Sequence, residues 1–246
     1  MAALRILGLL AALYGVLLAF VYWGQRRLLY FPSHDNRATQ LTPWVVDGRV
    51  IGYCAERADP REVWLMLHGN GGQASQRGYA LERMPPNASL YVLEYPGFGQ
   101  RMGEPSQSTI NAAALEAYAT LRNMHPALPV GVLGESIGSG PACMLAQDDN
   151  PPDKVVLVVP FDRLTRVAAR HFRFLPAGWL LRDRWDNVSA LQGYRGSVVI
   201  FGASQDEIIP IGHARELAAK VPEARLIEIP GGHNDWSYQE SVKVRF

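Results

Sequence analysis

Ser136 is the residue whose setting most clearly predicts chemistry in this chain. It stands in the middle of Gly-Glu-Ser-Ile-Gly at 134–138, between a short apolar run typical of a buried strand and a segment at 141–146 typical of a helix. A serine at the tip of such a strand-to-helix turn, the nucleophile elbow, holds its hydroxyl exposed for attack on a carbonyl carbon. Glycines on both sides let the strand and the helix approach closely, because they carry no Cβ.

An attacking serine needs a general base and a group that orients the base, and two later loops supply candidates. His233, in Pro-Gly-Gly-His after an apolar segment at 225–229, is the candidate base. Asp206, which follows an apolar segment at 197–201, is the candidate that holds the imidazole in its productive tautomer. Glu207 and Asp162 are the alternatives for this acid.

The loop His-Gly-Asn-Gly-Gly at 68–72 follows an apolar run at 63–67. Its glycines let the backbone come close to a substrate oxygen. We expect the amides of Asn70 and Ile137 to form an oxyanion hole, with the helix dipole favouring negative charge near the Ile137 amide. His68 is expected to be a structural residue of the loop rather than a base.

Apolar segments typical of strands alternate with segments typical of helices from residue 63 onward. Strands are expected at 63–67, 90–95, 155–159, 197–201 and 225–229 besides the one before Ser136, helices at 73–84, 109–124, 141–146, 213–221 and 237–244, and a hairpin at 44–55. This alternation predicts an α/β fold with a mostly parallel central sheet and helices on both faces. Ligands of such sheets bind at the carboxyl ends of the strands, where all the candidate residues fall.

Residues 6–25 carry no charge and are numerous enough to cross a bilayer. Tyr22 and Trp23 stand where an interfacial aromatic belt would lie, and Arg26 and Arg27 close the segment. The bulky residues at 20–23 make a poor cleavage site, so an uncleaved anchor is favoured over a cleaved signal peptide or a soluble core helix. The expected organisation is an anchor at 1–27, a neck and linker at 28–43, and a globular domain at 44–246.

Composition and spacing argue against several other functions. The net charge of +1 over 246 residues gives no basic field for nucleic acid. The two cysteines, Cys54 and Cys143, make neither a disulfide framework nor a zinc spacing, and no phosphate-binding Gly-Lys motif is present. We therefore expect no metal and no cofactor.

Taken together, these motifs and Glu-Tyr-Pro-Gly-Phe-Gly at 94–99 resemble the α/β-hydrolase superfamily, in which serine, acid and histidine follow in this order. An apolar anchor followed by Leu-Leu-Tyr-Phe-Pro at 28–32 is similar to its single-pass membrane-anchored serine hydrolases, which include aminopeptidase-like bacterial enzymes and animal depalmitoylases. The resemblance covers roughly residues 5–240 and implies a triad of Ser136, His233 and Asp206. The chain lacks the N-terminal cysteine cluster at which those depalmitoylases are lipidated.

Residues 163–184 are strongly basic within a near-neutral chain and carry several aromatic side chains. In the fold that the chain resembles, a small cap is inserted here, at about 162–192. Two interpretations are open. The cap packs its apolar face on the sheet, or it rests on anionic headgroups and admits acyl substrates from the bilayer.

The sequence thus predicts a membrane-anchored serine hydrolase that cleaves carboxylic esters or thioesters through an acyl-enzyme. Its expected partners are a small acyl substrate, with lipids among the candidates, and the membrane, which is the inner membrane if the source is bacterial. A peptidase or amidase of the same fold and a non-catalytic membrane-anchored scaffold are the alternatives. An epoxide hydrolase or a haloalkane dehalogenase would carry aspartate in place of Ser136.

Overall fold

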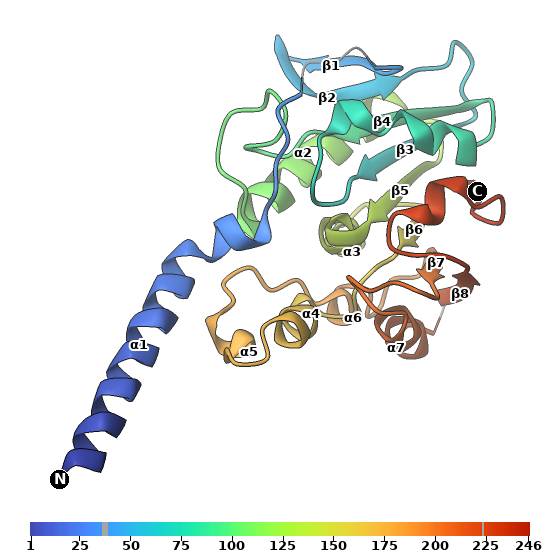
Figure 1. Cartoon of the computed structure of the whole chain (residues 1–246). Helices are drawn as coiled ribbons and strands as arrows, with labels where there is room; N and C mark the ends of the chain where they lie inside the picture. Colours follow the sequence, from blue (N-terminus) through green and yellow to red (C-terminus); the bar gives the residue numbers. More distant parts are fainter. Residues whose placement is uncertain (36–38, 223) are drawn as a thin grey trace.

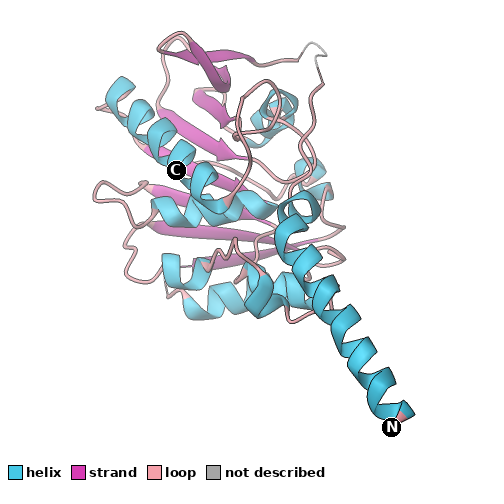
Figure 2. Ribbon diagram, turned by 90° about the vertical axis from the view of Figure 1, so that its left-hand side faces the viewer, coloured by secondary structure: helices cyan, strands magenta, loops and turns pink. Residues whose placement is uncertain are grey.

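The computed structural model describes residues 1–35, 39–222 and 224–246. Its first element, α1 (Ala2–Leu29), is a single helix that projects from the body of the protein (Figures 1 and 2). The helix is long and apolar enough to cross a membrane, and the most apolar stretch of it is not buried against the body. A core helix of a soluble domain would bury that stretch, so α1 does not behave as one.

The body is built on one eight-stranded sheet within the described residues, in the order β1-β2-β4-β3-β5-β6-β7-β8. The hairpin strands β1 (Thr42–Val46) and β2 (Arg49–Ala55) are antiparallel to each other, and β2 is antiparallel to β4. The other strands all run parallel: β3 (Glu62–Leu67), β4 (Ala88–Leu93), β5 (Val130–Glu135), β6 (Lys154–Val158), β7 (Ser197–Ala203) and β8 (Ala224–Ile229). The predicted α/β fold with a mostly parallel sheet is confirmed.

The hairpin turns where the sequence predicts it. Asp47 and Gly48 have φ of 48° and 74°, as the two central residues of a type I′ turn require. The hairpin covers the edge of β4, so the parallel strands are extended by two antiparallel ones at this side of the sheet.

One face of the sheet is covered by α-helices. They are α2 (Gln107–Met124), α3 (Ser139–Leu145), α6 (Asn187–Ala190) and α7 (Gly212–Lys220). Alternate strand residues such as Val63, Leu65 and Leu67 pack with these helices in one core cluster. Two further short helices, α4 (Leu164–His171) and α5 (Ala177–Leu180), lie between β6 and β7 in the segment that we expected to form a cap.

The opposite face is covered by 3₁₀ helices, turns and irregular chain, which corrects two predicted α-helices. The segment at 73–84 forms η1 (Ala74–Gln76) and η2 (Gly78–Arg83), with Gly78 where the turns meet. At 237–244 only η4 (Asp235–Tyr238) is helical. Beyond it the chain turns, with the Val242 amide bonded to the Gln239 carbonyl. Val242 and Val244, two residues apart, are then both buried against this face, and the Val244 amide bonds to the Arg83 carbonyl.

Candidate active site

Ser136 lies directly after β5 with φ of 53°, the left-handed region that side chains rarely adopt. The two flanking glycines make this turn possible. A Cβ on Gly134 would come within 2.7 Å of the Ala142 Cβ, and one on Gly138 would collide with the Leu67 carbonyl. The tight packing of β5, β3 and α3 thus leaves the serine at the tip of a strained turn, with Ser139 Oγ bonded to its carbonyl at 2.7 Å.

The loop after β8 brings His233 to this serine. Its Nε2 lies 2.9 Å from Ser136 Oγ, and its Nδ1 lies 2.7 Å from Asp206 Oδ2. Asp206, in the loop after β7, is itself held in place, since its Oδ1 accepts hydrogen bonds from the amides of Ile208 and Ile209. Three side chains from the ends of β5, β7 and β8 therefore form one hydrogen-bonded chain.

The two alternative acids lie elsewhere. Glu207 is exposed to solvent. Asp162 is buried and accepts a hydrogen bond from His213 Nδ1 at 2.5 Å, and it also contacts Arg166. Burial alone would raise the pKa of the Asp162 carboxyl. The hydrogen bonds from His213, the Arg163 backbone and Arg166 outweigh it and lower the pKa below its usual value.

The loop at 68–72 approaches the same serine, and both residues expected to form an oxyanion hole, Asn70 and Ile137, border the cavity at Ser136. The amide of Gly69 donates to Glu135 Oε2 at 2.9 Å, so it is directed away from the cavity. The side chain of Asn70 joins the loop to the end of α1. Its Nδ2 donates to the Leu29 carbonyl at 2.5 Å and its Oδ1 accepts from the Phe31 amide at 2.9 Å.

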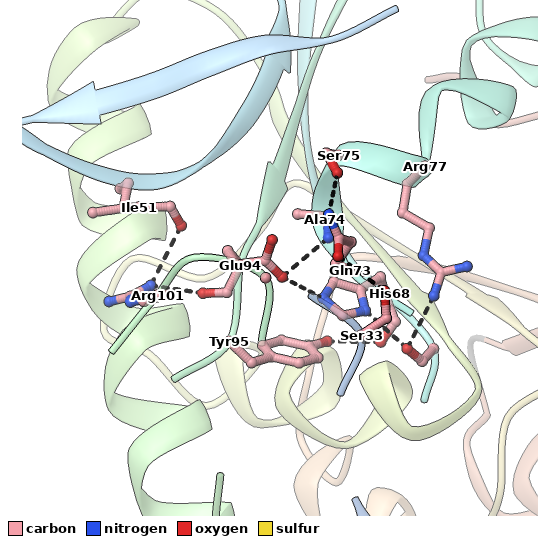
Figure 3. Close-up of polar contacts among 12 residues, drawn as sticks. Ser33, Ile51, His68, Gln73, Ala74, Ser75, Arg77, Glu94, Tyr95 and Arg101 are labelled. Carbon is pink, nitrogen blue, oxygen red and sulfur yellow. Dashed lines mark hydrogen bonds and ion pairs between the residues drawn. The ribbon is translucent and has the colours of Figure 1, made fainter. Parts of the chain in front are cut away.

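A buried polar cluster supports this loop from behind (Figure 3). His68 is fully buried, stacks on Tyr95 with ring centroids 4.2 Å apart, and has Nε2 3.6 Å from Glu94 Oε1. Glu94 Oε1 also accepts from the Ala74 amide at 3.0 Å, and Tyr95 donates to the His68 carbonyl at 2.9 Å. The His68 ring nitrogens thus face the Gly69 carbonyl and Glu94, and the residue belongs to the structural support of the loop.

Glu135 is a site feature that sequence reasoning missed. Its buried carboxylate accepts hydrogen bonds from the Gly69 amide, the Tyr79 hydroxyl and the Trp236 indole, each at 2.9 Å, and lies 4.0 Å from Arg77. Burial by itself would raise the pKa of the carboxyl. Arg77 and the three hydrogen bonds outweigh it and keep the pKa below its usual value. The available signal was a charged residue in an otherwise apolar strand, directly before the elbow serine.

A largely apolar cavity of about 370 Å³ opens beside Ser136. One part of its wall is the last part of α1, and another part comes from α4, α5 and the chain between them. Lining residues from these two parts include Val21, Leu28, Leu29, Val167, Leu175 and Leu180. Within the described ranges, no group of three or more His, Cys, Asp or Glu side chains is placed to hold a metal ion.

The sheet order, the elbow and the loops at the strand ends define the α/β-hydrolase fold. Solved structures with this fold include the esterase Pf2001 of Pyrococcus furiosus, which has a TM-score of 0.62 and 13% identity over 83% of this chain and 90% of that one. Est1E of Butyrivibrio proteoclasticus, solved with ferulic acid bound, has a TM-score of 0.60 and 14% identity over 76% of this chain and 88% of its own. The resemblance to the α/β-hydrolase superfamily is confirmed at the level of the fold.

Proteins related by sequence agree with this assignment to the α/β-hydrolase fold, although no family model matches the chain. An uncharacterized protein of Mycobacterium tuberculosis is 29% identical over 250 residues, which cover 95% of this chain and 89% of the relative. The lysophosphatidylserine lipase ABHD12 of Xenopus tropicalis is 26% identical over 208 residues, or 74% of this chain. The chain spans about half the length of that lipase, 54%. Together these likenesses support a hydrolase of α/β fold.

Proposed function

We propose that this protein is a membrane-anchored serine hydrolase that cleaves carboxylic ester or thioester bonds through an acyl-enzyme. The proposal rests above all on one contact, the 2.9 Å between His233 Nε2 and Ser136 Oγ, with Asp206 2.7 Å from the other ring nitrogen. In this arrangement Asp206 accepts a hydrogen bond from the Nδ1–H group, which leaves the Nε2 lone pair to accept the serine proton.

In the first half of the reaction, His233 takes the proton of Ser136 as its oxygen attacks the carbonyl carbon of the substrate. The oxygen of the tetrahedral intermediate then accepts hydrogen bonds from the amides of Asn70 and Ile137. The engagement of the Gly69 amide with Glu135 supports this choice of donors, because Asn70 carries the next amide along the loop. His233 passes its proton to the leaving alcohol or thiol, and the acyl group stays on Ser136.

In the second half, His233 removes a proton from a water molecule that attacks the acyl-enzyme. The second tetrahedral intermediate then collapses, the bond from the acyl carbon to Ser136 Oγ breaks, His233 returns the proton to Ser136, and the acid product leaves. Asp206 stabilises the imidazolium in both halves. Every step is a proton transfer, an addition to a carbonyl carbon or the expulsion of a leaving group from it, so the proposed mechanism draws on no metal and no cofactor.

The apolar cavity supports an acyl chain as the part of the substrate that is bound. The name of one relative, a lysophosphatidylserine lipase, supports a lipid ester as the first substrate class to test. Residues 1–27 serve as a single-pass anchor, 28–43 as the neck and 44–246 as the hydrolase domain, with a cap at about 162–192. Residues 36–38 of that neck lie outside the described residues.

A fluorophosphonate probe on membranes that contain the protein tests the proposal, with p-nitrophenyl esters of graded chain length as substrates. The wild type is expected to be labelled and to hydrolyse these esters, while Ser136→Ala keeps its fold and loses both properties. An unlabelled wild type would leave the non-catalytic scaffold as the better description. Hydrolysis retained by Ser136→Ala would refute the assignment of the nucleophile.

A further inference from the structure

The cap contacts the anchor helix at several points between Tyr14 and Arg26. Near the top of the contact, Gln25 Nε2 donates to the Leu180 carbonyl at 2.9 Å, and Gln25 Oε1 accepts from the Arg182 amide at 2.7 Å. Far down the helix, the Tyr14 hydroxyl donates to the Phe174 carbonyl at 2.8 Å. The chain from 172 to 183, here termed the cap strip, is therefore attached to α1 at two separate levels.

These two levels fix where the cap strip would lie in a bilayer. From Tyr14 to Arg26 is twelve residues, or about 18 Å along a helix axis. The hydrocarbon of one leaflet is about 15 Å deep. With Arg26 and Arg27 at the interface nearest the body, Tyr14 is about 3 Å deeper than this leaflet, so the chain at Phe174 lies near the bilayer midplane.

The side chains of the cap strip suit this position. Phe174 and Trp179 are each 90% exposed, which leaves two large aromatic surfaces unburied by the protein itself. Arg182, at the level of Gln25, is also exposed. Its long side chain passes over the Tyr22 ring, and it can reach anionic headgroups while its stem stays among apolar groups. The lipid surface that α1 would cross is the occupant that this combination fits.

The same two elements form the walls of the acyl cavity. Val21, Gln25 and Leu28 of α1 line one part, and Phe172, Leu175 and Leu180 of the cap strip line another. The seam between α1 and the cap strip therefore lies between the cavity at Ser136 and the side of α1 that the lipids would contact. The cavity, at about 370 Å³, is near the low end of the range for ligand sites, which suits one acyl chain.

We propose that the cap strip is inserted in the leaflet nearest the body, and that its seam with α1 is a lateral port. Through this port a single acyl chain of a membrane-resident ester passes to Ser136 without leaving the bilayer. The port extends the proposed function and rests on it for the chemistry at Ser136. The depth of the cap strip in the bilayer can be measured independently of that chemistry.

Depth is tested first, with the full-length protein in vesicles of phosphatidylcholine and phosphatidylglycerol. Phe174→Cys and, as the control, Tyr238→Cys are labelled with an environment-sensitive NBD maleimide. The two native cysteines are buried, and Tyr238 is 82% exposed on η4 at the other side of the body. The label at 174 is expected to be quenched by doxyl lipids and protected from aqueous iodide, with the reverse at 238. A label at 174 that iodide quenches and doxyl lipids do not would overturn the insertion.

Passage through the port is tested by comparing two esters, a long-chain ester embedded in the vesicles and a short soluble one. Phe174→Glu and Trp179→Glu should lower the ratio of vesicle to soluble hydrolysis by about tenfold, the loss expected when a large apolar side chain no longer enters hydrocarbon. Tyr238→Glu should leave the ratio unchanged. A ratio unchanged in both cap variants would overturn the port. A wild type that hydrolyses neither ester refutes the proposed function, while the NBD result still decides the position of the cap strip.

Discussion

The indole Nε1 of Trp236 donates a hydrogen bond to Glu135 Oε1 at 2.9 Å. The two residues are neighbours of the site rather than members of it, since Glu135 precedes Ser136 and Trp236 stands three residues after His233. The other oxygen of the same carboxylate accepts from the Gly69 amide, directly before Asn70. One buried carboxylate thus connects the elbow, the histidine loop and the loop proposed to bind the oxyanion.

Replacing this carboxylate should therefore misplace three loops at once. For Glu135→Gln we expect a fall in kcat of about tenfold with KM changed little, because the positions of His233 and the amide donors shift while the acyl cavity stays intact. The loss of charge-assisted hydrogen bonds should also cost about 2 kcal/mol of folding free energy. Steady-state kinetics on a soluble ester and denaturant unfolding measure the two effects. Glu82→Gln, on an exposed carboxylate, serves as the matched control and should change neither. A normal kcat in the Glu135 variant would show that the loops are positioned without it.

The depressed pKa of Glu135 also predicts how stability depends on pH. A carboxyl with a lower pKa in the folded state stabilises the fold fully above its unfolded pKa, about 4.3, and this contribution is lost as the pH falls through the lower folded value. The wild type should therefore lose stability from about pH 5 downward. Thermal unfolding measured across this range should show a shallower acid loss for Glu135→Gln than for the wild type. Parallel curves would mean that other carboxylates, such as Asp162, carry the effect.

The sequence contains enough to place Ser136, Asp206 and His233 at one edge of the sheet, because each follows an apolar strand and parallel strands share their carboxyl edge. The role of Glu135 could not be predicted from the sequence, because its partners Gly69, Tyr79 and Trp236 come from three distant segments. Such contacts have no periodic signal, since they depend on how the loops fold back over the sheet.

The two wrong helices have different causes. Gly78, a poor helix former, lies within the segment at 73–84, and the segment at 237–244 turns at Gln239 and then buries Val242 and Val244 against the sheet. The sequence also did not predict that α1 forms part of the cavity wall. Its residues Val21, Leu28 and Leu29 belong to an apolar segment whose pattern already predicts a membrane span, so the pattern cannot also indicate a binding surface.

Two Asp–His pairs in the structure allow a direct comparison of the acid alternatives. Asp206 pairs with His233 and Asp162 pairs with His213, and both aspartates are buried. Asp206→Asn should lower kcat by about 10⁴-fold, because asparagine favours the wrong imidazole tautomer. Asp162→Asn should lower the melting temperature through the loss of its bonds to His213 and Arg166, and should leave kcat within about tenfold of the wild type. Ester hydrolysis and thermal unfolding of both variants check this, and equal losses of kcat would contradict the assignment of Asp206.

Hydrogen bonds to Asp183 join the end of the anchor helix to the cap. Asp183, 3% exposed, accepts hydrogen bonds from the Tyr30 hydroxyl at 3.0 Å and from Arg26 Nε at 3.2 Å. Burial and the nearby Asp183 charge raise the pKa of Tyr30, so the phenol stays protonated and able to donate. Asp183→Ala leaves the buried Tyr30 hydroxyl without its acceptor, which should cost about 1–2 kcal/mol and let the cap move away from α1.

Because α1 and the cap both line the cavity, loss of the Asp183 contacts should raise KM for long acyl esters about tenfold, while the KM for short esters stays near the wild-type value. Kinetics on the graded ester series, with the full-length protein, measure the KM for long and for short esters separately. Glu228→Ala removes a carboxylate from an exposed pair with Arg215 far from the cavity and should leave both values unchanged. An equal rise in KM for short and long esters would mean that Asp183 acts on the serine end of the site, and the cap would then not be held by this contact.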